Sequence, residues 1–383
     1  APAPPGAPLR EQQQAKAEAR QMKAAASRAS TRERSSRAQP PSPRGATGGT
    51  PKRQAGAYKE TELLQRIGQG TYGSVFRGMC NGEEVAVKVM PLQSDTAEDI
   101  KREIKIMREC ACDYIIAYRD AFIREHEMRS TLWVVMEFCR VGSTLDVMRR
   151  QGNPLSEQQS AWVIRGMLYA LDYMHTERRA IHRDIKAANV LLTADASVKL
   201  ADLGVAAQLY NTMSKRGTMI GTPHWMAPET LGQMGEDGQY DFKVDIWGVA
   251  ITAIELAQLA PPFADTKSVF KVMMLIVNGE PATLEPSTVA SPAFHDFLRA
   301  ALIKDPATRP SAAQLLEHPW ITGATRPTLA ALVAEQEEAL KQGYVSSGGG
   351  KDEDEGAAEE EISFDPSRRS SGGGGDQVAT MKL

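Results

Sequence analysis

The side chains best suited to chemistry lie in one short stretch and just beyond it. Asp184, Lys186 and Asn189 lie within residues 181–192, and Asp202 follows ten residues after that stretch. Isoleucine, valine and leucine residues surround them, which is typical of a polar loop held between buried strands. An acid, an amine and an amide at this spacing can position a reactant and neutralise its charge. A carboxylate such as that of Asp202 can also bind a metal ion.

A glycine-rich turn precedes an apolar strand that holds a single lysine. Residues 68–73 have the spacing Gly-x-Gly-x-x-Gly and join two strand-like runs, whereas a dinucleotide-binding turn with the same glycines opens a helix. Glycine lets the backbone of such a hairpin approach phosphate groups, to which N–H groups can donate. The alternative is a plain hairpin with a surface lysine. It is disfavoured because Lys88 stands among the valines and alanine of residues 85–89, where burial without a partner is costly.

An acidic partner for Lys88 is expected on a helix. Residues 96–109 carry apolar side chains at helical spacing with polar residues between them, and Glu103 borders the apolar stripe. We therefore assign Glu103 to Lys88. We also expect strands at residues 115–122 and 132–138, a charged surface connector over residues 124–131, and a long helix over residues 156–176 with Ser156 at its start.

Composition limits the class of protein. Hydrophobic residues make up 42% of the 383 residues, enough for a substantial core, and the net charge of −3 is too small for nucleic-acid binding by the protein as a whole. No run approaches the ~18 apolar residues of a membrane span. The start, Ala-Pro-Ala-Pro-Pro-Gly, is neither a signal peptide nor an initiator methionine, so we expect the native beginning to be missing.

The four cysteines indicate a reducing compartment. Cys80, Cys110, Cys112 and Cys139 do not have the spacing of a disulfide framework, and the Cys-Ala-Cys at 110–112 lacks a second ligand pair for zinc. We expect ordinary reduced thiols in an intracellular, cytoplasmic protein.

The two ends of the chain carry opposite charge. Residues 1–57 hold eleven Lys or Arg against three Glu, and residues 322–383 hold twelve acidic against six basic residues. Both ends are poor in apolar side chains that could offset ordering entropy, so we expect disordered, solvated arms that could also bind partners. A short helix is expected over residues 327–341, and both docking on the domain and partner binding stay open for it.

Five motifs together resemble the eukaryotic protein kinases of the Sterile-twenty group (Ste20), and most of all its Hippo-type, mammalian sterile-twenty-like members. They are LWVVMEFC at 132–139, HRDIKAAN at 182–189, GTPHWMAPE at 221–229, DIWG at 245–248 and DPATRP at 305–310. The resemblance covers roughly residues 62–321. It implies an α+β, bilobal protein kinase fold in residues 58–321. A small five-stranded antiparallel β N-lobe with one helix would occupy residues 58–138, and a larger, mainly helical C-lobe residues 139–321.

The resemblance also implies catalytic roles. Lys88 would hold the α- and β-phosphates of ATP, with Glu103 keeping it in place. Asp184 would accept or orient the proton of the substrate hydroxyl group. Lys186 would steady the γ-phosphate, and its position two residues after Asp184 is similar to serine/threonine rather than tyrosine kinases.

ATP and Mg²⁺ are the implied cofactors. Asp202 and Asn189 would bind magnesium. Met136 would gate the back of the adenine pocket, and Glu137 and Cys139 would offer backbone hydrogen bonds. The implied ATP-binding set is Ile67, Gly68, Gly70, Gly73, Val75, Ala86, Lys88, Met136, Glu137, Cys139 and Leu191.

Regulation by phosphorylation is implied as well. Arg183 is typical of kinases whose activation loop is ordered by a phosphate group. Thr218 matches the activating site and Thr222 the threonine that braces the catalytic loop, with Thr218 preferred over Thr222 as the phosphosite. Asp245 should support the backbone of the catalytic loop, and Glu229 and Arg309 should form a buried ion pair in the larger lobe. The chain departs from the group at His224, where an aromatic residue is usual, and at Leu203, where most kinases have phenylalanine.

The predicted function is therefore an ATP- and Mg²⁺-dependent protein serine/threonine kinase of a signalling cascade, activated by phosphorylation of its activation loop. Its partners would be protein substrates with Ser or Thr acceptors, and scaffold or activator proteins bound through the tails. The first alternative is a pseudokinase, a nucleotide-binding scaffold without turnover; it predicts the loss of Lys88, Asp184, Asn189 or Asp202, and all four are present. A small-molecule phosphotransferase is disfavoured by the Ala-Pro-Glu at 227–229.

Overall fold

The computed structural model describes the chain between residues 57 and 342, with gaps, and one short segment after it. The described ranges are 57–70, 73–92, 104–105, 107–126, 129–202, 223–232, 242–342 and 377–379. All of them belong to one unit, Gln54–Leu383. Glu103, Thr218 and Thr222 lie outside these ranges, so what the sequence predicts for them stays a prediction.

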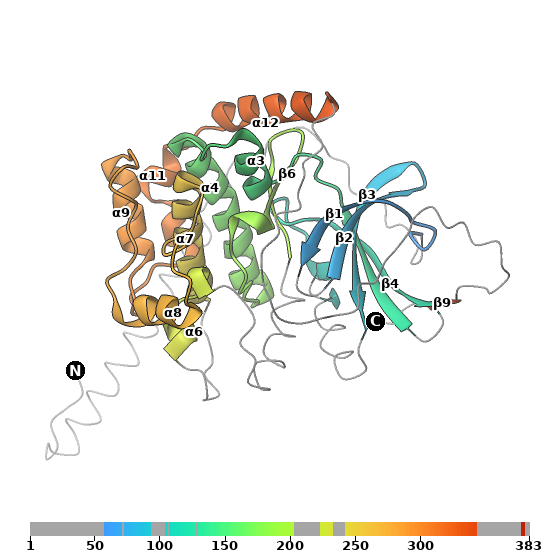
Figure 1. Cartoon of the computed structure of the whole chain (residues 1–383), viewed down its shortest axis with the longest axis horizontal. Coiled ribbons are helices and arrows are strands. Elements are labelled where there is room, and N and C mark those ends of the chain that lie inside the picture. The colour runs from blue at the N-terminus through green and yellow to red at the C-terminus, as the bar shows by residue number, and fades with distance from the viewer. Residues whose placement is uncertain are drawn as a thin grey trace, which may run out of the picture. The chain divides into compact units, whose positions relative to one another are not determined.

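Five strands between residues 62 and 137 form the antiparallel sheet of the smaller lobe, with spatial order β1-β2-β3-β5-β4 (Figure 1). Its strands are β1 (Glu62–Gly70), β2 (Gly73–Cys80), β3 (Glu83–Pro91), β4 (Tyr118–His126) and β5 (Arg129–Glu137). The predicted five-stranded lobe is confirmed. In the predicted helix over 96–109, the described residues Ile104 and Met107 are helical and buried.

The two faces of this sheet pack into different hydrophobic clusters. Leu132 and Val134 of β5 join the main core, which continues into the helical lobe. Trp133 and Val135, which alternate with them, pack with Tyr58 on the opposite face. Successive side chains of a strand point to opposite faces, so β5 alone contributes to both clusters.

The predicted surface connector over residues 124–131 is wrong, because the hairpin of β4 and β5 extends through most of it. Arg124 pairs with Thr131 in the ladder, and its guanidinium carbon lies 3.9 Å from the ring centroid of Trp133. Arg124 Nη2 also donates to Lys59 O at 2.8 Å. A charged residue that stacks on an aromatic ring and donates to the backbone in this way can extend a strand. At its other end β4 starts later than predicted, since Ile115 forms only an isolated bridge with Leu200.

A strand that sequence reasoning missed lies in the tail. The segment β9 (Gln377–Ala379) pairs antiparallel with the outer edge of β4, with Val378 opposite Arg124. An edge strand offers unpaired N–H and C=O groups to any extended segment that reaches it. β9 therefore makes the sheet six-stranded.

Helices and short strands build the larger lobe. The small sheet consists of β6 (Gly142–Ser143), β7 (Val190–Leu192) and β8 (Val198–Leu200). The helices are α3 (Thr144–Gln151), α4 (Glu157–Tyr173), α6 (Pro228–Gly232), α7 (Lys243–Gln258), α8 (Val269–Asn278), α9 (Pro292–Ala301), α10 (Ala312–Leu316), α11 (Pro319–Thr322) and α12 (Arg326–Lys341). Among the described residues, none of the helices combines the length and the apolar character that a membrane-spanning helix requires.

Local sequence explains where these helices begin. Ser156 starts α4 as predicted, because its side chain accepts from the Gln159 N–H while the Gln159 side chain accepts from the Ser156 N–H. A π-helical turn (Met174–Arg178) follows α4. Helix α7 is different, because it is mostly apolar and every residue from Asp245 to Leu256 is buried. Such a helix must lie in the centre of its lobe.

A single arginine fastens the base of the larger lobe, as predicted. Arg309 has no exposed side-chain surface, and its Nη1 and Nη2 donate to the two carboxylate oxygens of Glu229 at 2.7 and 3.1 Å. Its remaining N–H groups donate to three backbone carbonyl groups, those of Lys243, Ile303 and Lys304. All five donors of the guanidinium group are therefore paired, which is what makes a buried charge tolerable.

We predict that Arg309→Lys lowers the free energy of unfolding by about 3 kcal/mol, because an ammonium group cannot reproduce this planar set of donors. Urea unfolding of the full chain measures the change. Arg299→Lys is the matched control, since the Arg299 side chain is 72% exposed in its pair with Asp296; it should change stability by less than about 0.5 kcal/mol. Equal losses in the two variants would contradict the prediction.

Candidate active site

The polar loop of residues 181–189 is anchored to helix α7 by a buried carboxylate. The N–H groups of His182 and Arg183 donate to Asp245 Oδ2 and Oδ1, each at 2.8 Å. His175 Nε2 lies 2.8 Å from the same Oδ2. Burial would raise the pKa of Asp245, but the bonds from His175 and His182 outweigh it and hold that pKa below its ordinary value. The predicted support of the loop backbone by Asp245 is confirmed.

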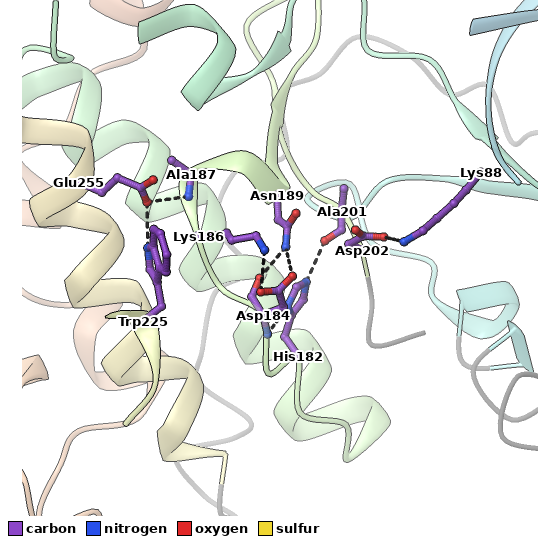
Figure 2. A network of polar contacts seen from close by, with 10 residues as sticks. All are labelled: Lys88, His182, Asp184, Lys186, Ala187, Asn189, Ala201, Asp202, Trp225 and Glu255. Carbon is purple, nitrogen blue, oxygen red and sulfur yellow. Dashed lines mark hydrogen bonds and ion pairs between the residues drawn. The ribbon is translucent and has the colours of Figure 1, made fainter. Parts of the chain in front are cut away.

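A second carboxylate of α7 holds the far side of the loop. Glu255 Oε2 accepts from the Ala187 N–H and from Trp225 Nε1–H, both at 2.9 Å (Figure 2). Glu255 is 3% exposed. Burial raises the pKa of Glu255, and the two hydrogen bonds only partly offset that effect. Glu255 therefore joins the loop to the short 3-10 helix Pro223–Trp225.

Asp184 lies between the amine and the amide that the sequence pairs with it. Lys186 Nζ is 3.0 Å from Asp184 Oδ1, and Asn189 Nδ2 donates to Asp184 Oδ2 at 2.8 Å (Figure 2). Asn189 Nδ2 also lies 2.7 Å from the Asp184 backbone oxygen. The Asp184 side chain is 38% exposed, so a substrate can reach it. The structure thus brings these three predicted residues together.

Lys88 contacts Asp202 directly. Lys88 Nζ, on β3, pairs with Asp202 Oδ1 in the segment after β8. Burial would raise the pKa of Asp202, but the charge and hydrogen bond of Lys88 outweigh it and hold that pKa below its ordinary value. The sequence predicted both residues for the site but assigned Lys88 to Glu103, which lies outside the described residues.

His182 links the two halves of the network. Its Nδ1 accepts from the Asp184 N–H at 3.3 Å, and its Nε2 lies 2.9 Å from Ala201 O, next to Asp202 (Figure 2). Since a carbonyl oxygen only accepts, these partners place the ring hydrogen on Nε2. Sequence reasoning quoted His182 in a motif without giving it a role.

Two residues of the site have left-handed backbone conformations. Arg183 has φ = 69° and Asp202 has φ = 62°. For residues with a side chain such values cost of order 1 kcal/mol each, and they persist only where the surroundings enforce them. At Arg183 the enforcing contact is the bond from its N–H to Asp245. The strain lies on both sides of the candidate catalytic residues.

The oxygens of the site fit magnesium. Because Asn189 donates through Nδ2, its side-chain carbonyl oxygen remains for a metal ion. Asp202 uses Oδ1 for Lys88 and keeps Oδ2. One carboxylate and one amide oxygen match the hard ligands that Mg²⁺ takes while it retains several waters.

Four residues predicted to bind the nucleotide, Val75, Ala86, Lys88 and Met136, share one face of the sheet. Val75 is paired with Gly68 on one side and with Lys88 on the other, and Ala86 is paired with Met136. Directly paired residues, and residues two apart on one strand, lie on the same face. This face includes Val134 and therefore belongs to the main core. Ile67 falls at an irregularity of β1 and is 46% exposed.

The segment that joins the lobes leaves backbone groups for a base. The Glu137 N–H donates to Ala117 O at 2.9 Å, so any backbone contact of Glu137 with a base must come from its carbonyl. Cys139 is 6% exposed, and its carbonyl accepts from the Gly142 N–H at 3.0 Å. Lys199 of β8 lies 3.5 Å from Glu137 Oε2 and ties this segment to the small sheet.

The predicted regulatory residues are only partly described. Arg183 is exposed, so its guanidinium group is accessible to a phosphate. His224 is half-buried, with Nε2 at 3.3 Å from Phe263 O, and desolvation lowers the pKa of its ring.

Sequence reasoning missed Glu255. A signal existed, since Glu255 is an acid within the otherwise apolar run of α7 and lies ten residues after Asp245.

We predict that Glu255→Gln flattens the pH dependence of stability. The raised pKa means that the folded state binds this proton more readily than the unfolded state, whose ordinary value is 4.5. The Glu255 contribution to the free energy of unfolding is therefore largest below 4.5 and falls as the pH rises through the raised pKa. Glutamine keeps the acceptor and removes the titration. Urea unfolding between about pH 5 and pH 8 measures the slope.

The exposed residue Glu335 supplies the control for this experiment. Glu335→Gln should leave the slope of the parent chain unchanged. A Glu255→Gln curve that runs parallel to the parent curve over the whole range would contradict the assignment.

Comparisons with known proteins agree with this geometry. The protein kinase domain family matches residues 61–321. Serine/threonine-protein kinase cst-1 of Caenorhabditis elegans is 41% identical over 283 residues, which cover 73% of this chain and 55% of that protein. The protein of the same name from Caenorhabditis briggsae is 41% identical over 285 residues, or 74% of this chain and 56% of that protein. The chain spans about half the length of these curated relatives. The family match covers well over half of the chain and contains every residue of the polar network, so this chain belongs to the protein kinase family.

Proposed function

We propose that the chain is an ATP- and Mg²⁺-dependent protein serine/threonine kinase of the Ste20 group, Hippo type. The observation that carries the proposal is the polar network in which Lys88 meets Asp202 while Lys186 and Asn189 meet Asp184. The similarity to the two cst-1 proteins supports the acceptor class, since both are named serine/threonine-protein kinases. The reaction transfers the γ-phosphate of ATP to a Ser or Thr hydroxyl group of a protein.

The roles of the residues follow from their contacts. Asp184 accepts or orients the hydroxyl proton, because its carboxylate is accessible and is held on both oxygens. Lys186 contacts Asp184 and is one-third exposed, so it can also reach the γ-phosphate. Lys88 neutralises the α- and β-phosphates. Phosphoryl transfer needs little covalent help, so positioning and neutralisation of charge supply most of the catalysis.

Magnesium, when bound, neutralises and orients the phosphates. Asp202 and Asn189 are the residues that would hold it. The glycines at 68, 70 and 73 and the sheet residues Ile67, Val75, Ala86, Met136 and Leu191 complete the proposed ATP site. Glu103 is proposed as a second acidic partner of Lys88.

The pseudokinase alternative gains no support from the site. A scaffold without turnover has no need of the contacts that Lys186 and Asn189 make with Asp184, nor of strained backbone at Arg183 and Asp202.

The rest of the chain has proposed roles as well. We place the kinase domain at residues 58–321, with lobes at 58–138 and 139–321. The basic segment 1–57 and the acidic segment 322–383 would bind scaffold or activator proteins. The four cysteines are free, which supports a cytoplasmic location.

We predict that Asp184→Asn lowers kcat by about 10²–10⁴, the usual contribution of a positioned base, while the KM for ATP stays within about twofold. A steady-state assay with radiolabelled ATP and a generic protein substrate measures both constants. Asp296→Asn is the matched control, because the Asp296 side chain is 60% exposed in α9; it should retain the parent rate. An Asp184→Asn enzyme as fast as this control would refute the proposed role.

A second prediction concerns activation. Phosphate on Thr218 adds nearly two negative charges, and exposed Arg183 can bind it through charge-assisted hydrogen bonds. We expect phosphorylation of Thr218 to raise the rate about tenfold in the parent. Arg183→Ala should remove this stimulation and leave the rate of the unphosphorylated enzyme unchanged. Rates of both phosphorylation states are compared, with the states verified by mass spectrometry. Equal stimulation in parent and variant, or full activity with Thr218 and Thr222 both unmodified, would argue against loop control.

A further inference from the structure

Helix α12 lies outside the residues that match the protein kinase domain, yet it is built into the larger lobe. Figure 1 shows it lying over α3 and α4. Gln159 Nε2 of α4 donates to Thr328 O at 3.3 Å, and Arg326 Nη2 donates to Asp195 O in the turn between β7 and β8. The buried residues of α12 recur every three or four positions: Leu329, Leu332, Val333 and Gln336.

One member of this buried stripe is polar. Gln336 is 5% exposed, and a buried amide is costly unless it is hydrogen-bonded. Its Oε1 accepts from Arg150 Nε at 2.8 Å. A leucine or methionine would continue the apolar stripe equally well. Glutamine differs from them in accepting the hydrogen bond from Arg150. This bond is therefore the feature that distinguishes position 336.

Arg150 carries the contact onward to the segment that joins the two lobes. Its Nη2 donates to Val141 O at 2.6 Å, nine residues back along the chain. Val141 is buried and lies two residues after Cys139. The next residue, Gly142, has φ = 85° and donates its N–H to Cys139 O. Arg150 thus braces the turn that ends the Glu137–Cys139 segment.

We propose that α12 positions the adenine-binding segment, with Gln336 fixing Arg150 and Arg150 fixing the turn at Val141 and Gly142. Gln336 is a positioning residue, because it touches neither nucleotide nor substrate. The inference rests on the proposed function, in which Glu137 and Cys139 hold adenine. It assigns residues beyond the matched protein kinase domain to the affinity for ATP.

The kinetic test compares three full-length variants. Gln336→Leu keeps the volume of the side chain and removes the acceptor, so the KM for ATP should rise about threefold to tenfold, while kcat and the KM for a peptide substrate stay within about twofold. Gln336→Glu keeps the acceptor and should restore the parent KM. Glu335→Leu, on the neighbouring exposed position of α12, should behave as the parent. A Gln336→Leu enzyme with the parent KM for ATP would overturn the proposal.

A double variant tests whether Gln336 acts through Arg150. If it does, Arg150→Met combined with Gln336→Leu should raise the KM for ATP no further than Arg150→Met alone. Multiplying effects in the double variant would mean that the two residues act independently, which contradicts the proposed connection.

Hydrogen–deuterium exchange separates this inference from the proposed function. In the absence of nucleotide, Gln336→Leu should speed exchange at the Gly142 amide and leave exchange in α7 unchanged. This result would support the brace even in a chain that proves to have no kinase activity. Unchanged exchange at Gly142 would overturn the brace whatever the activity of the parent. If exchange rises in α7 as much as at Gly142, Gln336 has only a general structural role, and the proposed positioning role would also be overturned.

Discussion

The site depends on how the catalytic loop is held along one face of a buried helix. Asp245 binds the N–H groups at the start of the loop, Gly248 leaves room for Ile185, and Glu255 binds the N–H of Ala187. The two carboxylates are ten residues apart on α7, which is about 15 Å along the axis. They therefore hold the loop at two separated points, on either side of Asp184.

Such an arrangement requires buried charge and strained backbone, and the surrounding lobe must offset both. Two carboxylates in the centre of a lobe are tolerated because each accepts at least two hydrogen bonds. The left-handed conformation at Arg183 persists for a related reason, since the bond from its N–H to Asp245 Oδ1 enforces it. The fully paired guanidinium group of Arg309 fixes Glu229 of α6 to the loop before α10. The geometry of the candidate site is thus specified by polar contacts within an apolar lobe.

Local sequence patterns predicted much of this structure, but they did not predict several of the contacts between residues far apart in the sequence. The spacing of Asp184, Lys186 and Asn189 within six residues is enough to bring them together, and the capping residues of α4 mark its start. The ion pair of Lys88 with Asp202 and the hydrogen bond from the Ala187 N–H to Glu255 join residues far apart in the sequence. No local periodicity reveals such contacts. Charge was misleading in the β4–β5 hairpin, because Arg124 stacks on Trp133 and extends the strand. The tail strand β9 carries no alternation long enough to stand out.

Strand β9 also sets an order of events during biosynthesis. It is translated about 250 residues after β4, which corresponds to roughly 12–50 s at the usual rate of 5–20 residues per second. Throughout this interval the outer edge of β4 lacks its partner, while the strands on its other side can already form their ladder. A nascent chain of this protein therefore exposes an open sheet edge for tens of seconds, and molecular chaperones have that time to act on it.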